Sequence, residues 1–204
     1  VALLYGVTGS GKTSVYIRLI RQALEEGKSA LLLVPEIALT PQLLGKLTSH
    51  FGRQVAVLHS SLRVGERFDE WRRIQSGEAR VVVGTRSAVF APAENLGLIL
   101  VDEEQEHTYK SENAPRYHAR EVAIYRGVQE GTLVVLGSAT PSVESMYFAR
   151  SGVYSLYTMR QRYNGQALPA VEIVDMKQEL RNGNPASISG ALEERLRENI
   201  LSGR

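Results

Sequence analysis

The sequence predicts an α/β fold, a doubly wound parallel sheet with helices on both faces. Short, continuous apolar runs alternate with segments of helical pattern over residues 1–160, and such runs are typical of strands buried on both sides. The first run leads directly into a glycine-rich segment and then a helix. In such sheets ligands gather at the carboxyl ends of the strands, so the residues that follow each apolar run are candidates for function.

The elements can be placed from the apolar runs and from the turn residues between them. Thr40 is a good N-cap before a proline at the first helical position, and Gly27 ends the first helix. The expected strands are residues 1–5, 29–34, 55–58, 81–83, 98–101 and 133–136. The first expected helix follows the glycine-rich segment and ends at Glu26. The other expected helices span residues 41–51, 66–74, 114–129 and 142–150.

The last part of the chain has a weaker pattern. Residues 161–169 are a polar connection, 171–174 are expected to form a strand, and 181–185 a turn. Residues 187–201 are predicted to form a helix with Leu192 and Leu196 on one face and Ile200 continuing it. We therefore expect a main domain over 1–160 and a C-terminal extension over 161–204.

Composition excludes several classes of protein. The 204 residues are 43% hydrophobic and 23% charged, which is enough for a full α/β core. The net charge is only +2, so nucleic-acid contacts must come from a local patch. Without cysteine there is no disulfide or thiolate metal site, and no apolar run approaches the ~20 residues that span a bilayer. We expect a cytoplasmic protein, and a fragment of a longer one because the chain begins inside an apolar run without Met.

Residues 6–13, GVTGSGKT, match the P-loop pattern GxxxxGK[ST] between an apolar run and a helix. Such a loop turns backbone N–H groups toward phosphate oxygens, and the helix directs its positive dipole end at the same anion. Lys12 would face the β- and γ-phosphates, and the Thr13 hydroxyl would ligate a bridging Mg²⁺. A glycine-rich helix cap is the alternative, which the Lys-Thr pair disfavours. The expected nucleotide-binding residues are Gly6, Thr8, Gly9, Ser10, Gly11, Lys12 and Thr13.

Three consecutive carboxylates, Asp102, Glu103 and Glu104, follow the apolar run 98–101. A P-loop site needs an acid at such a strand exit to hold Mg²⁺, and an ATPase needs a second one to deprotonate the attacking water. Asp102 suits the first role and Glu103 the second. A charged cap on a strand end is common in isolation, but the upstream P-loop favours catalysis.

Further strand exits carry VPEIALTPQ at 34–42, GTRSA at 84–88 and GSAT at 137–140. Together with the P-loop and the acids, these resemble motifs I, Ia, Ib, II and III of superfamily 2 helicases. The longer strings VLHSSL, GTRSAVFAP, NLGLILVDEE, YKSENAPRYHAR and LGSATPSVES are similar to the PriA family of replication-restart helicases (primosomal protein N′). The resemblance covers nearly the whole chain and implies the first RecA-like motor domain of a 3′-to-5′ DNA helicase.

The resemblance also implies a path for single-stranded DNA. The residues after Pro35, including Thr40, and those around Thr85 and Arg86 are expected to contact phosphates through backbone N–H groups and hydroxyls. Such contacts carry no base information, as a translocating motor requires. On its own, Arg86 is more typical of a solvated loop charge.

The chain departs from the family at Gln105, where the family usually has His; here His107 lies two residues further on. Both side chains can donate and accept hydrogen bonds, so Gln105 can link the γ-phosphate region to Ser138 and Thr140. Those two residues are expected to couple nucleotide to DNA, although a Ser-Ala-Thr-Pro turn is also a good helix entry.

Residues 106–120 place aromatic side chains among cations between two expected strands, which suits a loop that stacks on bases and grips phosphates. In the family this segment corresponds to the aromatic-rich loop that couples DNA binding to ATP hydrolysis. The alternative is that Tyr117 and His118 begin the next helix and pack on the sheet. The candidate residues are Tyr109, Arg116, Tyr117 and His118.

The residues themselves predict a P-loop domain that binds ATP and Mg²⁺, and the resemblance implies that it is an ATP-dependent DNA helicase motor. By resemblance, its partners are single-stranded and forked DNA, primosome proteins and single-stranded DNA-binding protein. The family's second RecA-like domain with its arginine finger, its zinc-binding cysteine cluster and its amino-terminal DNA-binding region are not in this sequence, so the chain alone is expected to be inactive. The alternatives are another P-loop ATPase, such as a small-molecule kinase or a different translocase, and a nucleotide-gated protein-interaction module without DNA coupling. A kinase would need an arginine-bearing lid and an acceptor pocket, and the sequence shows neither.

Overall fold

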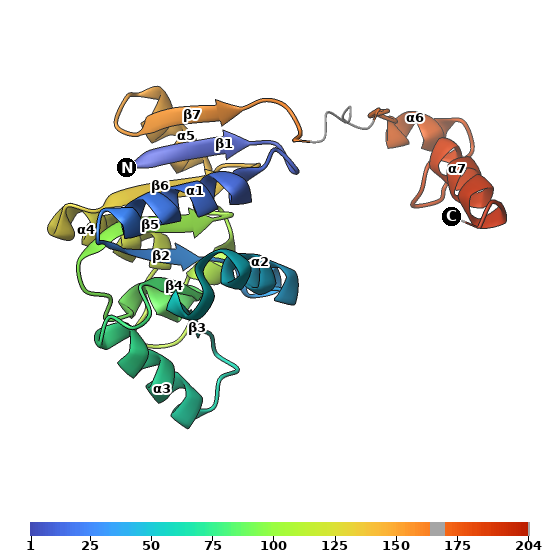
Figure 1. The fold of residues 1–204 in the computed structure, drawn as a ribbon. Helices are drawn as coiled ribbons and strands as arrows, with labels where there is room; N and C mark the ends of the chain where they lie inside the picture. Colours follow the sequence, from blue (N-terminus) through green and yellow to red (C-terminus); the bar gives the residue numbers. More distant parts are fainter. Residues whose placement is uncertain (164–169, 204) are drawn as a thin grey trace. The chain divides into compact units, whose positions relative to one another are not determined.

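The computed structural model describes residues 1–163 and 170–203, and the chain divides into two compact units, Val1–Gln166 and Ala167–Arg204. The first unit is built on a seven-stranded sheet in the order β3-β4-β2-β5-β6-β1-β7, and all of its paired strands run parallel (Figure 1). The strands are β1 (Ala2–Gly6), β2 (Ser29–Leu33), β3 (Val55–Leu58), β4 (Val81–Gly84), β5 (Leu96–Asp102), β6 (Leu133–Ser138) and β7 (Ser155–Met159).

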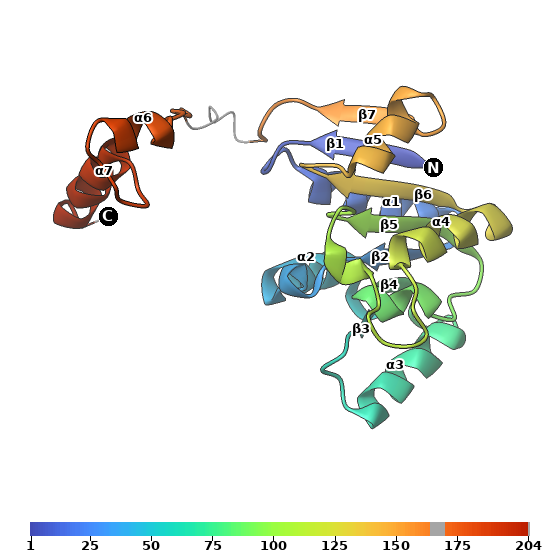
Figure 2. The same ribbon diagram turned by 180° about the vertical axis from the view of Figure 1, so that it is seen from behind.

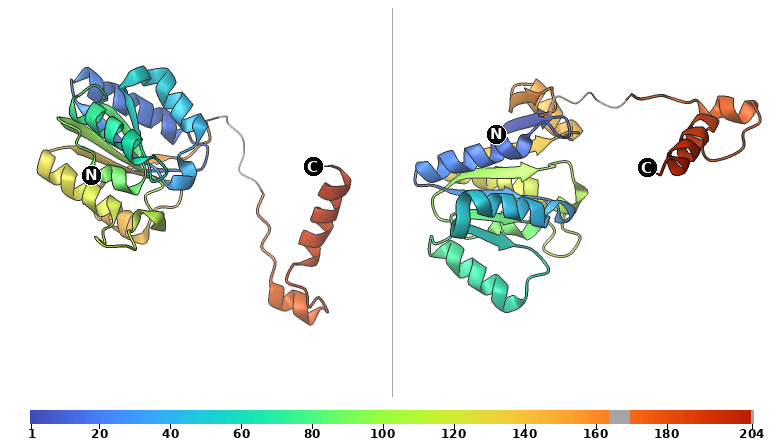
Figure 3. Two further views of the ribbon diagram at one scale, coloured as in Figure 1. Left: turned by 90° about the horizontal axis from the view of Figure 1, so that it is seen from below. Right: turned by 45° about the vertical axis from the view of Figure 1, so that its right-hand side comes forward.

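Helices cover both faces of this sheet. The buried side chains of α1 (Lys12–Glu25) and α2 (Pro41–Phe51) pack on one face. Those of α3 (Val64–Gln75), α4 (Ala119–Glu130) and α5 (Val143–Arg150) pack on the other, which faces the viewer in Figure 2. The left view of Figure 3 separates the two layers, with blue α1 and yellow α4 on opposite sides of the strands. Short 3-10 helices are η1 (Glu36–Ala38), η2 (Gly52–Gln54), η3 (Arg86–Phe90) and η4 (His107–Tyr109).

The apolar runs form strands because both of their faces are buried. All five residues of β2 are buried. Its consecutive residues Leu31 and Leu32 belong to the apolar clusters on opposite faces of the sheet, as the two-residue period of a strand requires. This confirms the predicted doubly wound α/β fold.

Two elements of the first unit differ from the expectations. Strand β7 was not expected, because four of its five residues are exposed and it lies at the edge of the sheet, so it lacks the continuous apolar run of a buried strand. The helix expected from residue 114 begins only at Ala119. Before it the chain doubles back, with the N–H of Ser111 donating to the carbonyl of Tyr117 at 2.8 Å and an antiparallel bridge between Lys110 and His118. The Ala114–Pro115 peptide inside this loop is cis.

The second unit contains α6 (Met176–Arg181) and α7 (Gly190–Leu201). The strand expected at 171–174 is wrong, since in the described part of the chain Val171 and Ile173 are exposed and pair with no strand. The helix expected at 187–201 starts at Gly190, after Ser189 accepts the N–H of Leu192 as its N-cap. Most of the expected connection 161–169 lies outside the described residues. Among those residues, we find no helix with the length and apolarity to cross a bilayer.

Candidate nucleotide-binding site and adjoining loop

The P-loop has the strand, loop and helix setting that its sequence predicts. Strand β1 ends at Gly6 and α1 begins at Lys12, and Gly9 and Gly11 between them have φ of 78° and 93°, a conformation that side chains with a Cβ rarely adopt. The Lys12 Nζ bends back and donates to the carbonyl of Gly6 at 2.9 Å. The loop therefore wraps around the N-terminus of α1 with its lysine at the centre.

A cavity of about 460 Å³ opens over this loop and has the chemistry of an anion site. The Oγ of Ser10 is buried without a hydrogen-bond partner in the described part of the chain, and the first N–H groups of a helix have no intrahelical acceptor. An anion between them and Lys12 would satisfy all of these groups. The cavity is lined by Thr8, Gly9, Ser10, Gly11, Lys12, Thr13, Ser14, Lys46, Asp102, Glu103 and Tyr163.

Asp102 is fixed at the carboxyl end of β5 by two buried tyrosines. Tyr16 of α1 donates its hydroxyl to Oδ1 of Asp102, and Tyr109 donates to the carbonyl oxygen of Asp102, each at 2.7 Å. Burial raises the pKa of the Asp102 carboxyl, while the hydrogen bond from Tyr16 opposes that shift. Gly137 of β6 leaves the space that the Tyr16 hydroxyl fills, because a Cβ there would overlap it. We did not expect the role of Tyr16; its one signal is a hydroxyl-bearing aromatic on the apolar face of the first helix.

The second acid, Glu103, begins a hydrogen-bonded chain. Its φ of 44° is unusual for a residue with a Cβ, and its carboxylate lies 4.0 Å from the Nζ of Lys12. The side chain of Gln105 donates to Glu103 at 3.0 Å and accepts from the Oγ of Ser138 at 2.6 Å. Ser138 in turn accepts the N–H of Thr140 at 2.9 Å. The structure thus joins the residues that the sequence predicted as a coupling group.

The third acid, Glu104, has a structural environment that the sequence analysis missed. It is fully buried, and its carboxylate accepts from Arg120 at 2.6 Å, from the N–H of Ser142 at 2.7 Å and from the Oγ of Ser145 at 2.9 Å. Ser142 is the N-cap of α5, and Arg120 lies in the first turn of α4. This buried ion pair, the Glu104–Arg120 pair, holds the end of β5 to the starts of two helices.

A second cavity, of about 260 Å³, brings the predicted DNA-contacting segments to the loop 106–118. Arg86 donates to the carbonyl of Lys110 at 2.7 Å, so its side chain holds this loop. Thr40 is not among the lining residues; its Oγ1 accepts the N–H of Leu43 and caps α2. The lining residues are Val34, Pro35, Glu36, Thr85, Arg86, His107, Thr108, Tyr109, Lys110 and Glu112.

The aromatic side chains of the loop do not form the expected stacking surface. Tyr109 is only 1% exposed and donates its hydroxyl to the carbonyl of Asp102, so its ring offers no face to a base in this structure, and its coupling role stays a prediction. Tyr117 is half-buried and packs edge-on against Phe90, with ring centroids 4.9 Å apart. Arg116 is exposed. A loop that follows a strand with catalytic acids at its end can bury its aromatic side chains in the core. The sequence pattern is the same whether those side chains are buried or exposed to stack on a base.

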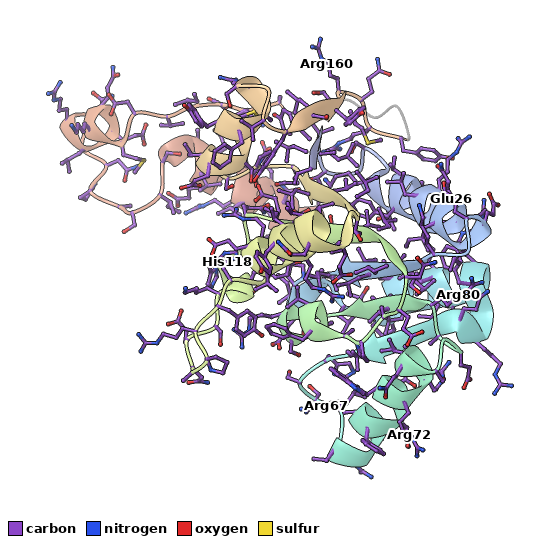
Figure 4. All side chains as sticks on the ribbon, turned by 90° about the vertical axis from the view of Figure 1, so that its left-hand side faces the viewer. Glu26, Arg67, Arg72, Arg80, His118 and Arg160 are labelled. Carbon is purple, nitrogen blue, oxygen red and sulfur yellow. The ribbon has the colours of Figure 1, made fainter. Side chains whose placement is uncertain are left out.

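His118 marks the start of α4, where Figure 4 labels it. It is half-buried, and its Nδ1 has no hydrogen-bond partner within the described residues. Burial lowers the pKa of its imidazole, and the positive charge of Arg120 lowers it further. The ring therefore stays neutral at physiological pH and packs at the base of the loop.

A parallel sheet with a P-loop after β1 and paired acids after β5 defines the α/β P-loop fold of the RecA-like kind. The sequence model of the family described as DEAD/DEAH box helicase matches residues 2–147, so the chain belongs to that family.

Relatives place the chain within this family. It is 54% identical over 203 residues to "Replication restart protein PriA" of Bacillus subtilis, covering 100% of this chain and 25% of that protein. It is 50% identical over 176 residues to the PriA protein of Treponema pallidum, covering 86% of this chain and 27% of that one. The chain thus spans about a quarter of these relatives. The Hef helicase domain of Pyrococcus furiosus shares the fold, with a TM-score of 0.58 at 20% identity over 80% of this chain and 35% of that one.

Proposed function

We propose that this chain is the ATP-binding motor domain of a DNA helicase that acts in replication restart and moves 3′ to 5′ along DNA. The observation that carries the proposal is the hydrogen-bonded chain from Glu103 through Gln105 and Ser138 to Thr140, at the same sheet edge as the P-loop. The similarity to replication restart proteins supports the choice of process, and the direction comes from the same resemblance.

In the proposed site the P-loop backbone and Lys12 hold the phosphates of ATP. Thr13 and Asp102 would hold Mg²⁺, which neutralises charge on the transferred phosphate when it is bound. Among the described residues no cluster of three or more acidic or histidine side chains could hold a metal, which suits Mg²⁺ because it takes few protein ligands and several phosphate oxygens. Glu103 accepts the proton of the attacking water.

In the same proposal, single-stranded DNA lies along the second cavity, next to the loop 106–118. The segments that begin at Pro35 and Thr85 supply backbone and hydroxyl contacts to phosphates, and the exposed Lys110 and Arg116 supply positive charge. Because Arg86 holds the carbonyl of Lys110, a strand that displaces Arg86 also frees the loop. Forked DNA, primosome proteins and single-stranded DNA-binding protein are its proposed partners in the cytoplasm.

The chain by itself binds Mg·ATP weakly and hydrolyses it hardly at all. In related phosphoryl transfer, an arginine from a second domain or partner is worth ~10³ to 10⁵ in rate, and the proposed source of that arginine is a second RecA-like domain beyond residue 204. In this proposal residues 161–204 lead toward that domain.

The experiment uses the full-length protein that carries this sequence and two partial duplexes of the same sequence, one with a 3′ single-stranded tail and one with a 5′ tail. We expect ATP-dependent strand separation of the duplex with the 3′ tail and not of the duplex with the 5′ tail. A motor that moves 3′ to 5′ reaches the duplex only when it loads on a 3′ tail. The Lys12→Ala variant is the control, since it lacks the main positive charge facing the phosphates. ATP turnover by the wild type without separation of either duplex would contradict a helicase and favour a nucleotide-gated interaction module.

A further inference from the structure

The sheet topology brings a distant segment of the chain to the mouth of the P-loop. Strand β7 runs parallel beside β1, and Met159 at its end is the partner of Gly6. The residues that follow β7 therefore emerge at the same edge as the P-loop. Arg160, directly after β7, points away from the sheet in Figure 4, but the chain then turns back, and the N–H of Tyr163 donates to the carbonyl of Gly9 at 2.9 Å.

This backbone bond places the ring of Tyr163 against the loop. A methyl group built on the Cα of Gly11 would lie 3.6 Å from Cδ2 of Tyr163, so the ring is in contact range of the first turn of α1. Tyr163 lines the same cavity as Lys12, Thr13 and Asp102. Yet 85% of Tyr163 is exposed, so a large aromatic surface is held beside an anion site and left open to a ligand.

We propose that Tyr163 is a stacking platform for the base of the nucleotide whose phosphates lie in the P-loop. This inference rests on the proposed nucleotide site and adds the part of the ligand that the glycines and Lys12 do not contact. A neutral ring gains little from a phosphate, whereas an aromatic face next to the phosphate cradle matches a flat heteroaromatic base.

Arg162 gives the platform a polar neighbour. Its Cγ lies 3.9 Å from a methyl group built on Gly9, and its Nε is buried without a hydrogen-bond partner among the described residues. The stem of Arg162 therefore lies against the P-loop at the position next to Tyr163. The ligand class is a nucleoside di- or triphosphate, and the platform detects a base without choosing among bases, because every base offers a π-face.

The test compares a ligand that has a base with one that lacks it. Dissociation constants of Mg·ADP and of Mg·tripolyphosphate are measured by calorimetry on the 204-residue chain and its Tyr163→Ala variant. We expect Tyr163→Ala to weaken Mg·ADP about five-fold or more and to leave tripolyphosphate unchanged. Tyr163→Phe should bind both ligands as the wild type does, since the ring is kept. The matched control is Tyr125→Ala on α4, where another exposed tyrosine, 66% exposed, lies outside the site.

Two results would overturn the platform while leaving the nucleotide site in place. If Tyr163→Ala weakened both ligands equally, the ring would shape the loop and would not contact a base. If Tyr163→Ala left the affinity for both ligands unchanged, the ring would make no contact with the bound nucleotide. A wild-type chain that binds neither ligand would instead overturn the nucleotide site and the platform with it.

Discussion

Removing the charge of Arg120 tests how much the Glu104–Arg120 pair, which holds the end of β5 to the starts of α4 and α5, contributes to the stability of the fold. Arg120→Met keeps most of the volume of the side-chain stem and leaves Glu104, which has no exposed surface, without its cation. Breaking a buried pair from one side costs ~3 to 5 kcal/mol, and the remaining hydrogen bonds from Ser142 and Ser145 favour the lower end of that range. For a domain of this size ~3 kcal/mol corresponds to a fall in Tm of about 6 to 12 °C.

The assay is thermal unfolding of the 204-residue chain followed by circular dichroism. The control is Glu26→Gln, which breaks an exposed pair with Lys28 and should leave Tm nearly unchanged. If Arg120→Met melted with the wild type at neutral pH, the pair would carry no stability and the reasoning would be refuted.

Three further predictions concern the acids, the loop and pH. In the full-length protein Glu103→Gln should retain ATP but fail to hydrolyse it, because an amide cannot accept the water's proton, whereas Asp102→Asn should raise the Mg²⁺ concentration needed for turnover; equal loss of ATP binding in both would contradict these roles. Arg116→Ala should depress DNA-stimulated hydrolysis without lowering Tm, since its side chain is exposed, and a lowered Tm with normal stimulation would reverse that assignment. The lowered pKa of His118 means that the folded state releases its proton more readily than the unfolded chain, so stability should be full above about pH 6.5 and fall as the pH drops through the folded pKa. His118→Gln should flatten that decline in Tm, and an unchanged slope would exclude His118 as its source.

The sequence predicts the parts of this molecule that are buried or chemically demanding. Continuous apolar runs identify the central strands because both faces of a parallel sheet are covered, and the glycines of the P-loop are needed for its positive φ angles. Edge strand β7 was not predicted because its side chains are exposed. The strand expected at 171–174 was wrong because a short run with apolar residues does not by itself supply a partner strand.

Contacts between distant segments are harder to foresee. The proximity of Tyr16 to Asp102 depends on how α1 crosses the sheet, and that of Arg120 to Glu104 depends on where α4 begins. The helix starts later than the sequence indicates because the loop 110–118 closes on itself first. Tyr163 reaches the P-loop only through the unpredicted strand β7. In each case the residue type is ordinary, and its role comes from tertiary structure.

ATP hydrolysis by the full-length protein, measured with and without a single-stranded oligonucleotide at fixed salt, tests the central claim that DNA occupancy acts on the ATP site. The account predicts that DNA stimulates turnover in the wild type and that this stimulation is lost when Gln105→Ala breaks the link between Glu103 and Ser138. The variant should still bind Mg·ADP, since Gln105 does not line the nucleotide cavity. Equal turnover with and without DNA in the wild type, or full stimulation in Gln105→Ala, would contradict it.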